Sequence, residues 1–346
     1  MSGNRYIKLE KKNLRVIGAA ILFIAALFFV LKMMLIIEER NNVIDVDPEE
    51  IEYQDDVDYS DVDSDMVFYN GQWYALRDDI TTLLLMGIDK DEEFVEQDRE
   101  YRNNQQADFL MLLLFDNSAQ TVSAIHLNRD TMTEINMIGM NGASVGSRVE
   151  QLCLAHTYGS DPKTSCVNTV VAVSGLLYGA RVDHYMSFTM DTVPVVNDYY
   201  GGVTVHLDED FTYIDPEMIK DTDYTLYGDN ALRYIRARMN VGDGTNLSRM
   251  KRHREYIYAL LEKTKDKQNS GKDPMELLSK LSGSLVSDCT LDQMSDLKNK
   301  FESYALGEIT TINGEALQGE KHVEYYVDED ALLNMVLSTF FEPADR

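Results

Sequence analysis

Cysteine and basic residues are both scarce in this chain of 346 residues. Its three cysteines include no Cys-x-x-Cys pair, which excludes a scaffold held together by many disulfides. Its 32 lysine and arginine residues are outnumbered by 59 aspartate and glutamate residues, and the net charge is −27. Because nucleic acids are bound by clustered lysine and arginine residues, we expect no nucleic-acid partner. Any anionic ligand would have to bind at a local basic cluster.

Several motifs of known enzymes and metal sites are also absent. The sequence has no Gly-x-Ser-x-Gly motif, so a serine hydrolase has no support. The six histidines have none of the spacings of zinc ligands. The acidic stretches contain no Asp-x-Asp-x-Asp-Gly loop, which argues against a calcium site. Hydrophobic residues make up 44% of the chain, which is enough to fill a core and excludes a wholly disordered protein.

Residues 16–37 form an apolar run of 22 residues that is interrupted only by Lys32. About 20 such residues cross a bilayer, and no small-x-small cleavage site follows, so we expect a retained transmembrane helix rather than a cleaved signal peptide. Five basic residues precede the run, and the sequence after it is strongly acidic. The positive-inside rule therefore predicts a single-pass cell-membrane protein, with residues 1–15 in the cytoplasm and the rest outside.

The segment after the apolar run is acidic, and a folded domain is expected to follow it. Residues 45–65 contain 11 acidic residues and no lysine or arginine. Such a run repels itself, so we interpret residues 38–65 as an extended linker. The Asn70-Gly71 pair within residues 66–76 predicts a β-hairpin at the start of the domain.

The rest of the chain alternates between predicted strands and predicted helices. Four apolar runs (82–88, 109–115, 122–127 and 185–190) are predicted to be buried strands, and 203–205 a further strand. Helices are expected at 167–179, 191–200 and 247–265. This alternation predicts a layered α/β/α domain with a central mixed sheet over residues 66–268. Residues 269–346 are expected to form a C-terminal extension of helices around a short strand pair, packed on the core.

Two carboxylates stand where predicted strands begin or end. Asp89 follows the first buried strand, and Asp108 opens the second. Carboxylates at neighbouring strand ends suit a hard cation such as Mg²⁺, although a single aspartate at a strand end is more often a turn former. Arg129 and Asp130 follow the third strand and are expected at the same edge of the sheet. A surface ion pair is the alternative for these two residues.

A local basic cluster lies between Asp229 and Glu255, a segment that contains seven basic and three acidic residues. We expect Arg236 and Arg238 to share one face of an extended stretch, residues 232–239. Spacings of three and four predict that Arg249, Arg252 and His253 share one face of a helix. Together these residues would cradle the oxygens of a diphosphate. The alternative is a solvated basic surface.

A metal held by two carboxylates, a set of arginines and an extracytoplasmic location together indicate phosphoryl transfer. Its catalysis consists mostly of positioning and charge neutralisation. Because no ATP is expected outside the cell, the phosphate donor would have to arrive on a lipid carrier.

Several of these segments resemble the LytR-CpsA-Psr family of cell-wall proteins over residues 83–265. The matching segments are 107–112 (Ala-Asp-Phe-Leu-Met-Leu), 127–131 (Leu-Asn-Arg-Asp-Thr), 156–159 (His-Thr-Tyr-Gly), 198–205 with Gly-Gly-Val-Thr-Val, 231–238 ending Arg-Ala-Arg, and 249–252 (Arg-Met-Lys-Arg). The resemblance implies a membrane-anchored enzyme that uses Mg²⁺. It would move an anionic glycopolymer, such as teichoic acid or capsular polysaccharide, from a polyprenyl-diphosphate carrier onto a peptidoglycan acceptor.

The family's functional residues carry over by motif. Asp89 and Asp108 match its metal-associated carboxylates. The residues that match its diphosphate-binding arginines are Arg129, Arg236, Arg238 and Arg249, to which we add Arg252 and His253. We expect the catalytic groups to be Asp108, Arg129, Asp130 and Arg238.

The chain departs from the family at three positions, where Asn128 replaces proline, Gln106 replaces arginine and His253 replaces glutamine. We expect these changes to affect efficiency or substrate choice rather than the class of reaction. The resemblance also implies an apolar tunnel for the lipid. Candidate lining residues are 167–178 together with Met186, Phe188 and Met190.

Two points stay open at this stage. Cys153 and Cys166 would lie in a compartment where disulfides persist, so they are either bridged or free, whereas Cys289 is expected to be free and buried.

The function also has alternatives. The arginines expected to bind the diphosphate would also suit a polyprenyl-diphosphate hydrolase, or a non-catalytic wall-binding or regulatory protein.

Overall fold

The structure, a computed structural model, describes residues 66–90, 103–139, 143–238, 241–266, 269, 271–319 and 322–344. The expected cytoplasmic tail, the transmembrane helix at 16–37 and the acidic linker lie outside these residues. Among the helices that the structure describes, none combines the length and the apolar character needed to cross a membrane.

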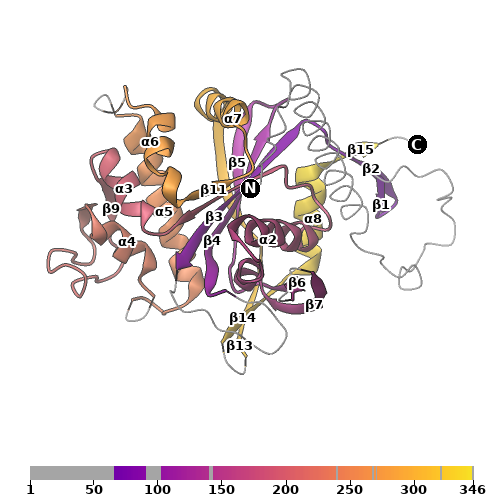
Figure 1. Cartoon of the computed structure of the whole chain (residues 1–346), viewed down its shortest axis with the longest axis horizontal. Helices are drawn as coiled ribbons and strands as arrows, with labels where there is room; N and C mark the ends of the chain where they lie inside the picture. The colour runs from indigo at the N-terminus through magenta and orange to yellow at the C-terminus, as the bar shows by residue number, and fades with distance from the viewer. Residues whose placement is uncertain are drawn as a thin grey trace, which may run out of the picture. The chain divides into compact units, whose positions relative to one another are not determined.

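A six-stranded mixed sheet lies at the centre of the fold, as the sequence predicts (Figure 1). Its strand order is β11 (Leu285–Ser287), β8 (His184–Thr189), β3 (Ile80–Lys90), β4 (Gln105–Asp116), β5 (Thr121–Leu127) and β12 (Ala305–Thr311). β3, β4 and β5 form antiparallel pairs, whereas β8 joins β3 and β12 joins β5 in parallel. The four apolar runs of the sequence are therefore the four inner strands.

Both faces of this sheet are covered, which explains why its inner strands are almost continuously apolar. Leu84 and Met86 belong to a core that includes α2 (Pro162–Leu176) and α8 (Glu329–Phe340). Leu83 and Leu85 face the other side, in a cluster with α7 (Leu291–Ser303). Figure 1 shows α3–α6 gathered on one side of the sheet and α2 and α8 on the other.

A second core holds together the part of the fold that carries the basic cluster. It joins α3 (Thr192–Tyr199), β9 (Val203–His206), β10 (Asp223–Leu226), α4 (Asp229–Arg236) and α5 (Asn246–Thr264). α5 begins where the side chain of Thr245 accepts a hydrogen bond from the amide of Ser248, a common helix N-cap. β9 and β10 form a separate antiparallel pair.

The predicted hairpin is confirmed as β1 (Met66–Tyr69) and β2 (Gln72–Leu76). Asn70 and Gly71 have φ angles of 51° and 80°, which is the left-handed backbone that a tight two-residue hairpin turn requires. β15 (Phe341–Ala344) adds a third strand to this hairpin by pairing with β2.

The prediction that residues 232–239 are extended is wrong. α4 occupies Asp229–Arg236, and Ala237 and Arg238 then leave the helix in a loop. Tyr234 and Ile235 lie on the buried side of α4 with Ala231, so the segment has helical rather than alternating burial. Arg233 and Arg236 lie on the opposite, solvent side of α4, and the density of arginines hid the helical period.

Several strands were missed because little of their surface is apolar and buried. β6 (Met132–Ile138) and β7 (Ser144–Gln151) form a hairpin before the 3-10 helix η2 (Leu152–Thr157). The segment after residue 269 contains the expected helices, among them α6 (Pro274–Lys280), and the expected short strand pair, β13 (Gly314–Gln318) and β14 (Val323–Val327). What the sequence did not predict is that this segment also contributes both edge strands of the central sheet, β11 and β12.

Candidate active site

An irregularity between β3 and β4 positions the central carboxylate. Asp89 is opposite Gln106, Ile88 is opposite Ala107 and Gly87 is opposite Phe109, so Asp108 is an extra residue in β4. Such a β-bulge bends the strand and redirects a side chain, often beside an active site. Here it directs Asp108 toward the turn that follows β5.

Arg129 of that turn forms an ion pair with Asp108. Its guanidinium also donates hydrogen bonds to the side-chain oxygen of Gln106 and, at 3.0 Å, to the Sγ atom of Cys153. Nε of Arg129 lies 3.3 Å from Oδ1 of the buried Asp130. The structure therefore brings three predicted site residues together, with Arg129 between two carboxylates.

Arg249 of α5 reaches the same carboxylate from the other side. Its Nη1 lies 3.3 Å from Oδ2 of Asp108, and both side chains are almost entirely shielded from solvent. Nε and Nη2 of Arg249 both donate to Oδ1 of Asn246, at 3.0 and 2.6 Å. Asp108 thus accepts two arginines from different elements, which fixes both guanidinium planes.

Asn128, a departure from the family pattern, links these two elements. Its Oδ1 accepts a hydrogen bond from Nδ2 of Asn246 at 2.6 Å and one from the amide of Asp130 at 3.0 Å. The turn after β5 is thereby fixed to the first residue of α5. Sequence reasoning missed Asn246, whose only signal was a polar residue three positions before an arginine on the same helix face.

Arg236 and Arg238 approach from the loop after α4. Arg236, the last residue of α4, forms an ion pair with Asp89, and both side chains are 42% exposed. Nε of Arg238 donates to the carbonyl of Gly244 at 3.3 Å. Burial lowers the pKa of Arg249, and repulsion from the nearby cation of Arg238 acts in the same direction.

Arg252 and His253 lie inside the fold rather than on its surface. Arg252 donates to the carbonyl of Ala237 and places its guanidinium over the ring of Phe211, so it supports the loop that carries Arg236 and Arg238. His253 is hydrogen-bonded through Nε2 to the carbonyl of Ile235 at 3.0 Å, and burial lowers its pKa to about 3. Direct contact of either residue with a substrate stays a prediction.

The electrostatics of the site favour an anion. The predicted set contains three carboxylates (Asp89, Asp108, Asp130) and five arginines (Arg129, Arg236, Arg238, Arg249, Arg252), so two positive charges are in excess within a strongly acidic chain. Burial acts to lower the pKa of Arg129, but the neighbouring thiol and carboxylates outweigh burial and raise it. The buried guanidinium of Arg129 therefore keeps its charge.

The donor atoms near Asp89 and Asp108 fit a hard cation. Asp89 and Gln106 are directly opposite in the β3–β4 pair, and Asp108 is two residues further along β4. Two carboxylates and an amide oxygen are ligands that Mg²⁺ accepts, and it commonly keeps several waters in addition. The ion pairs with Arg129, Arg236 and Arg249 neutralise these carboxylates within the chain itself.

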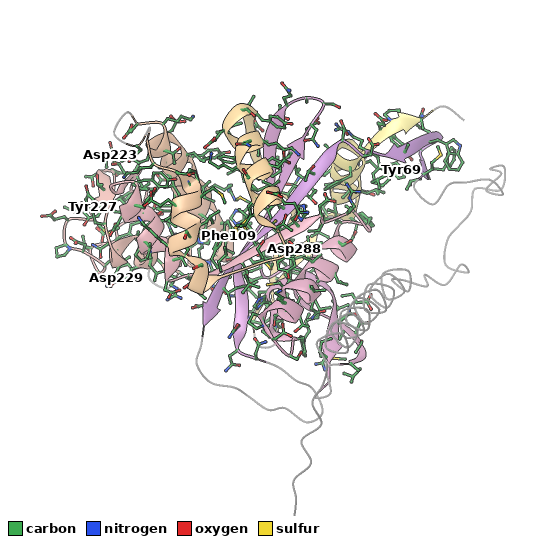
Figure 2. The ribbon with its side chains drawn as sticks, turned by 45° about the horizontal axis from the view of Figure 1, so that its top comes forward. Tyr69, Phe109, Asp223, Tyr227, Asp229 and Asp288 are labelled. Carbon is green, nitrogen blue, oxygen red and sulfur yellow. The ribbon has the colours of Figure 1, made fainter. Side chains whose placement is uncertain are left out.

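A large apolar cavity adjoins this site. It has a volume of about 650 Å³ and lies between the sheet and helices α3, α5 and α6. Phe188 and Met190 line it as predicted, together with Phe109 and His253. Phe109, labelled in the interior of Figure 2, directly follows Asp108, so the cavity extends to the residue beside the shared carboxylate.

Two other candidates for lining this cavity are wrong. Met186 packs in the cluster with Leu297 of α7. Residues 167–178 belong mostly to α2, whose buried residues Ala172 and Val173 are in the core on the opposite face of the sheet. The helical pattern of that segment was correct, but a sequence pattern does not say which face of the sheet a helix covers.

The three cysteines are free thiols. Cys153 is buried against Arg129, and Cys166 donates to Oγ of Ser187 at 3.2 Å. The open question of a bridge between them is thereby answered in favour of free thiols. Cys289 is free as expected but only partly buried.

The chain is similar to known proteins over most of its length. The model of the LytR_cpsA_psr family matches residues 44–339. A relative from Bacillus licheniformis, named polyisoprenyl-teichoic acid–peptidoglycan teichoic acid transferase TagU, is 24% identical over 77% of this chain and 78% of its own. A protein of the same name from Halalkalibacterium halodurans is 24% identical over 65% of this chain and 66% of its own.

Solved structures share the fold. Protein gbs0355 from Streptococcus agalactiae has a TM-score of 0.58 at 19% identity, covering 75% of this chain and 86% of its own. TagV from B. subtilis has a TM-score of 0.53 at 20% identity, covering 76% and 98%. A structure described as TagT bound to LI-WTA has a TM-score of 0.54 at 19% identity, covering 76% and 91%.

Proposed function

The chain belongs to the LytR_cpsA_psr family, and from this membership and the site around Asp108 we propose that it is a membrane-anchored glycopolymer phosphotransferase. It would move an anionic glycopolymer, with teichoic acid as the first candidate, from a polyprenyl-diphosphate carrier onto peptidoglycan. The name of the TagU relatives supports this polymer and this acceptor. Residues 16–37 would hold the protein in the cell membrane, with the N-terminus in the cytoplasm.

One observation carries the proposal: two arginines share one carboxylate beside a large apolar cavity. A polyprenyl diphosphate has an apolar chain and an anionic head, and these two features match the two parts of the site. Burying apolar surface contributes about 25 cal/mol per Å², so the cavity would supply much of the affinity for the carrier. The arginines would then fix the position of the head group.

In the proposed reaction, a hydroxyl oxygen of peptidoglycan attacks the phosphorus that carries the glycopolymer. The bond from that phosphorus to the bridging oxygen breaks, and polyprenyl monophosphate leaves. Arg129 and Arg249 would neutralise charge on the phosphate oxygens in a cleft with little water, where such contacts are strong. Mg²⁺ held by Asp89 and Asp108 would add charge neutralisation at the same oxygens.

In this proposal the carboxylates also release the arginines to the substrate and accept a proton. Without a substrate, Asp108 compensates the two guanidiniums that contact it. A diphosphate would compete for the same arginines, since phosphate accepts bidentate arginine contacts as a carboxylate does. An exchange of partners of this kind would release oxygens of Asp108 for the cation, and one carboxylate of the site would take the proton of the attacking hydroxyl.

A transfer assay tests the proposal. The full chain in detergent is incubated with Mg²⁺, a polyprenyl-diphosphate-linked glycopolymer and peptidoglycan fragments, and attached polymer is measured. Transfer by the wild type, its loss in Arg249→Ala and its retention in Arg181→Ala support the proposal. Arg181 is exposed and pairs with Asp183, which is bonded to Thr82 at the other end of β3 from Asp89. Release of polymer phosphate without attachment favours a hydrolase, and binding without turnover favours a wall-binding or regulatory protein. Either result contradicts the proposed transferase.

A further inference from the structure

Three potential metal ligands meet at the start of β8, in a part of the fold that the proposed reaction does not use. His184 opens β8, and Asp288 and Cys289 follow β11. One nitrogen, one carboxylate oxygen and the sulfur of these residues all lie within 4.8 Å of one another. Nδ1 of His184 is 3.8 Å from Oδ1 of Asp288, and Sγ of Cys289 is 3.9 Å from the same oxygen. Among the residues that the structure describes, no other group of this kind is found.

We propose that His184, Asp288 and Cys289 bind a Zn²⁺ ion. Sulfur, imidazole nitrogen and carboxylate oxygen are the three ligand types of zinc, whereas Mg²⁺ and Ca²⁺ prefer oxygen alone. Zinc–ligand bonds of about 2.0–2.3 Å in a tetrahedron place ligand atoms roughly 3.3–3.6 Å apart. The separations of 3.8 and 3.9 Å from Asp288 are slightly wider, and the third lies within 4.8 Å, so rotations of the side chains would close the site.

The backbone already holds two of the ligands in place. The amide of Tyr185, the residue after His184, donates to Oδ1 of Asp288 at 2.9 Å. Oγ of Ser287 accepts from the amide of Cys289 at 3.1 Å and donates to the carbonyl of Tyr185 at 2.7 Å. Both segments are therefore fixed to each other without the ion, and hydrogen bonds of this kind orient metal ligands.

The exposure of the ligands fits a site with one open position. His184 is 18% exposed and Asp288 37% exposed, and Cys289 packs partly against the core beneath α7. Three protein ligands leave the fourth position of a zinc tetrahedron to water. His184 is opposite Leu83 in β3, whereas Asp89 lies at the other end of that strand, so this site is distinct from the candidate active site.

The ion would reinforce the pairing between β8 and β11, the short edge strand of the central sheet. β11 has only three residues, and it connects α6 and α7. Leu277 and Leu278 of α6 and Phe301 of α7 line the apolar cavity. A Zn²⁺ ion at the end of β11 would therefore stabilise the segment that covers the cavity, because a metal bound only in the folded state stabilises it by mass action.

Metal binding by the full chain in detergent tests the inference. We expect one Zn²⁺ per chain by titration calorimetry, and affinity lowered by about tenfold or more in His184→Gln and Cys289→Ser. His206→Gln is the matched control, because His206 also contacts an aspartate, Asp223, but in an exposed pair. Its Zn²⁺ affinity should equal that of the wild type.

Two measurements on the wild type keep the test decisive even if a variant folds poorly. Co²⁺ in place of Zn²⁺ should give a thiolate-to-metal charge-transfer band in the near ultraviolet, and Zn²⁺ should slow alkylation of Cys289. Failure to bind Zn²⁺ at micromolar concentrations, or a Co²⁺ complex without the thiolate band, would overturn the proposal. Unchanged affinity in a folded Cys289→Ser would do the same, and none of these results bears on the proposed transferase.

Discussion

Asn246 donates a 2.6 Å hydrogen bond to Asn128, although 118 residues separate them in the chain. Both side chains are buried. The bond joins the turn that presents Arg129 to the helix that presents Arg249, and Asn246 also accepts two hydrogen bonds from Arg249. The spacing of the two arginines around Asp108 therefore depends on a pair of amides.

Asn246→Ala should disturb this spacing. The change leaves Asn128 and the guanidinium of Arg249 with fewer partners, and a buried polar group without a partner costs about 1–3 kcal/mol. We expect a loss of that size in the free energy of unfolding, together with reduced transfer. Urea unfolding and the transfer assay measure the two effects. Asn334→Ala, on the exposed side of α8, serves as the control; equal stability of both variants would show that the amide pair contributes nothing.

Removal of Arg238 should weaken donor binding more than it weakens folding. Charge-assisted hydrogen bonds contribute about 1.5–3 kcal/mol each, and about 1.4 kcal/mol corresponds to a factor of ten. Arg238→Ala should therefore bind a polyprenyl diphosphate analogue at least about tenfold more weakly than the wild type. Arg236→Lys should also bind more weakly, since an ammonium lacks the planar pair of donors. Arg233→Ala is the control, because Arg233 is an exposed residue of α4, and this variant should bind normally. An unchanged affinity in a folded Arg238→Ala would show that Arg238 is not part of the site.

Asp108→Asn should affect stability and Mg²⁺ dependence together. Arg129 and Arg249 would lose the charge that they share, and breaking a buried ion pair on one side costs about 3 kcal/mol or more. Transfer should fall, and the Mg²⁺ concentration needed for half-maximal rate should rise. Asp116→Asn changes the carboxylate at the other end of β4, which pairs with Arg77, and should leave Mg²⁺ dependence unchanged. Full transfer with unaltered Mg²⁺ dependence in Asp108→Asn would refute the metal assignment.

Filling the apolar cavity should discriminate between long and short carriers. Val196 of α3 lines the cavity, whereas its neighbour Val195 is 45% exposed. Val196→Trp should lower affinity for a long-chain polyprenyl diphosphate and leave affinity for a short-chain diphosphate unchanged. Val195→Trp should alter neither. Equal binding of the long chain by both variants would show that the lipid lies elsewhere.

Buried histidines should make the fold sensitive to acid. Burial lowers the pKa of His253 to about 3 and that of His156 to about 4, whereas both titrate near 6.5 in the unfolded chain. Between these values the unfolded chain binds more protons, so the free energy of unfolding falls as the pH drops below about 6.5. Each such histidine adds a slope of about 1.4 kcal/mol per pH unit.

Replacement of His253 by glutamine, the usual family residue, should reduce this slope by about 1.4 kcal/mol per pH unit. Urea unfolding at several pH values between 7 and 4.5 measures the slope. His206→Gln is the control, because the hydrogen bond that His206 donates to Asp223 raises the pKa of this exposed histidine, and its removal should not make the dependence shallower. An identical slope in wild type and His253→Gln would mean that folding does not lower the pKa of His253.

The inner strands of the sheet could be predicted from the sequence. β3, β4, β5 and β8 are buried on both faces. Such strands are almost continuously apolar, so their positions can be predicted from the sequence. The Asn70-Gly71 turn could also be predicted, because few residues adopt the left-handed backbone that it requires. By contrast, β11 and β12 lie at sheet edges and β7 is largely exposed, and burial leaves little trace in such strands.

The sequence also predicted that Asp89, Asp108, Arg129 and Arg249 belong to one site, from the positions of strand ends and helix faces and from the family resemblance. Which of them are in contact depends on the tertiary structure. The bulge in β4 turns Asp108 toward Arg129, and the bond between Asn128 and Asn246 brings Arg249 to the same carboxylate. Such pairings depend on shifts of one residue and on contacts between distant segments, and neither leaves a periodic signal in a sequence.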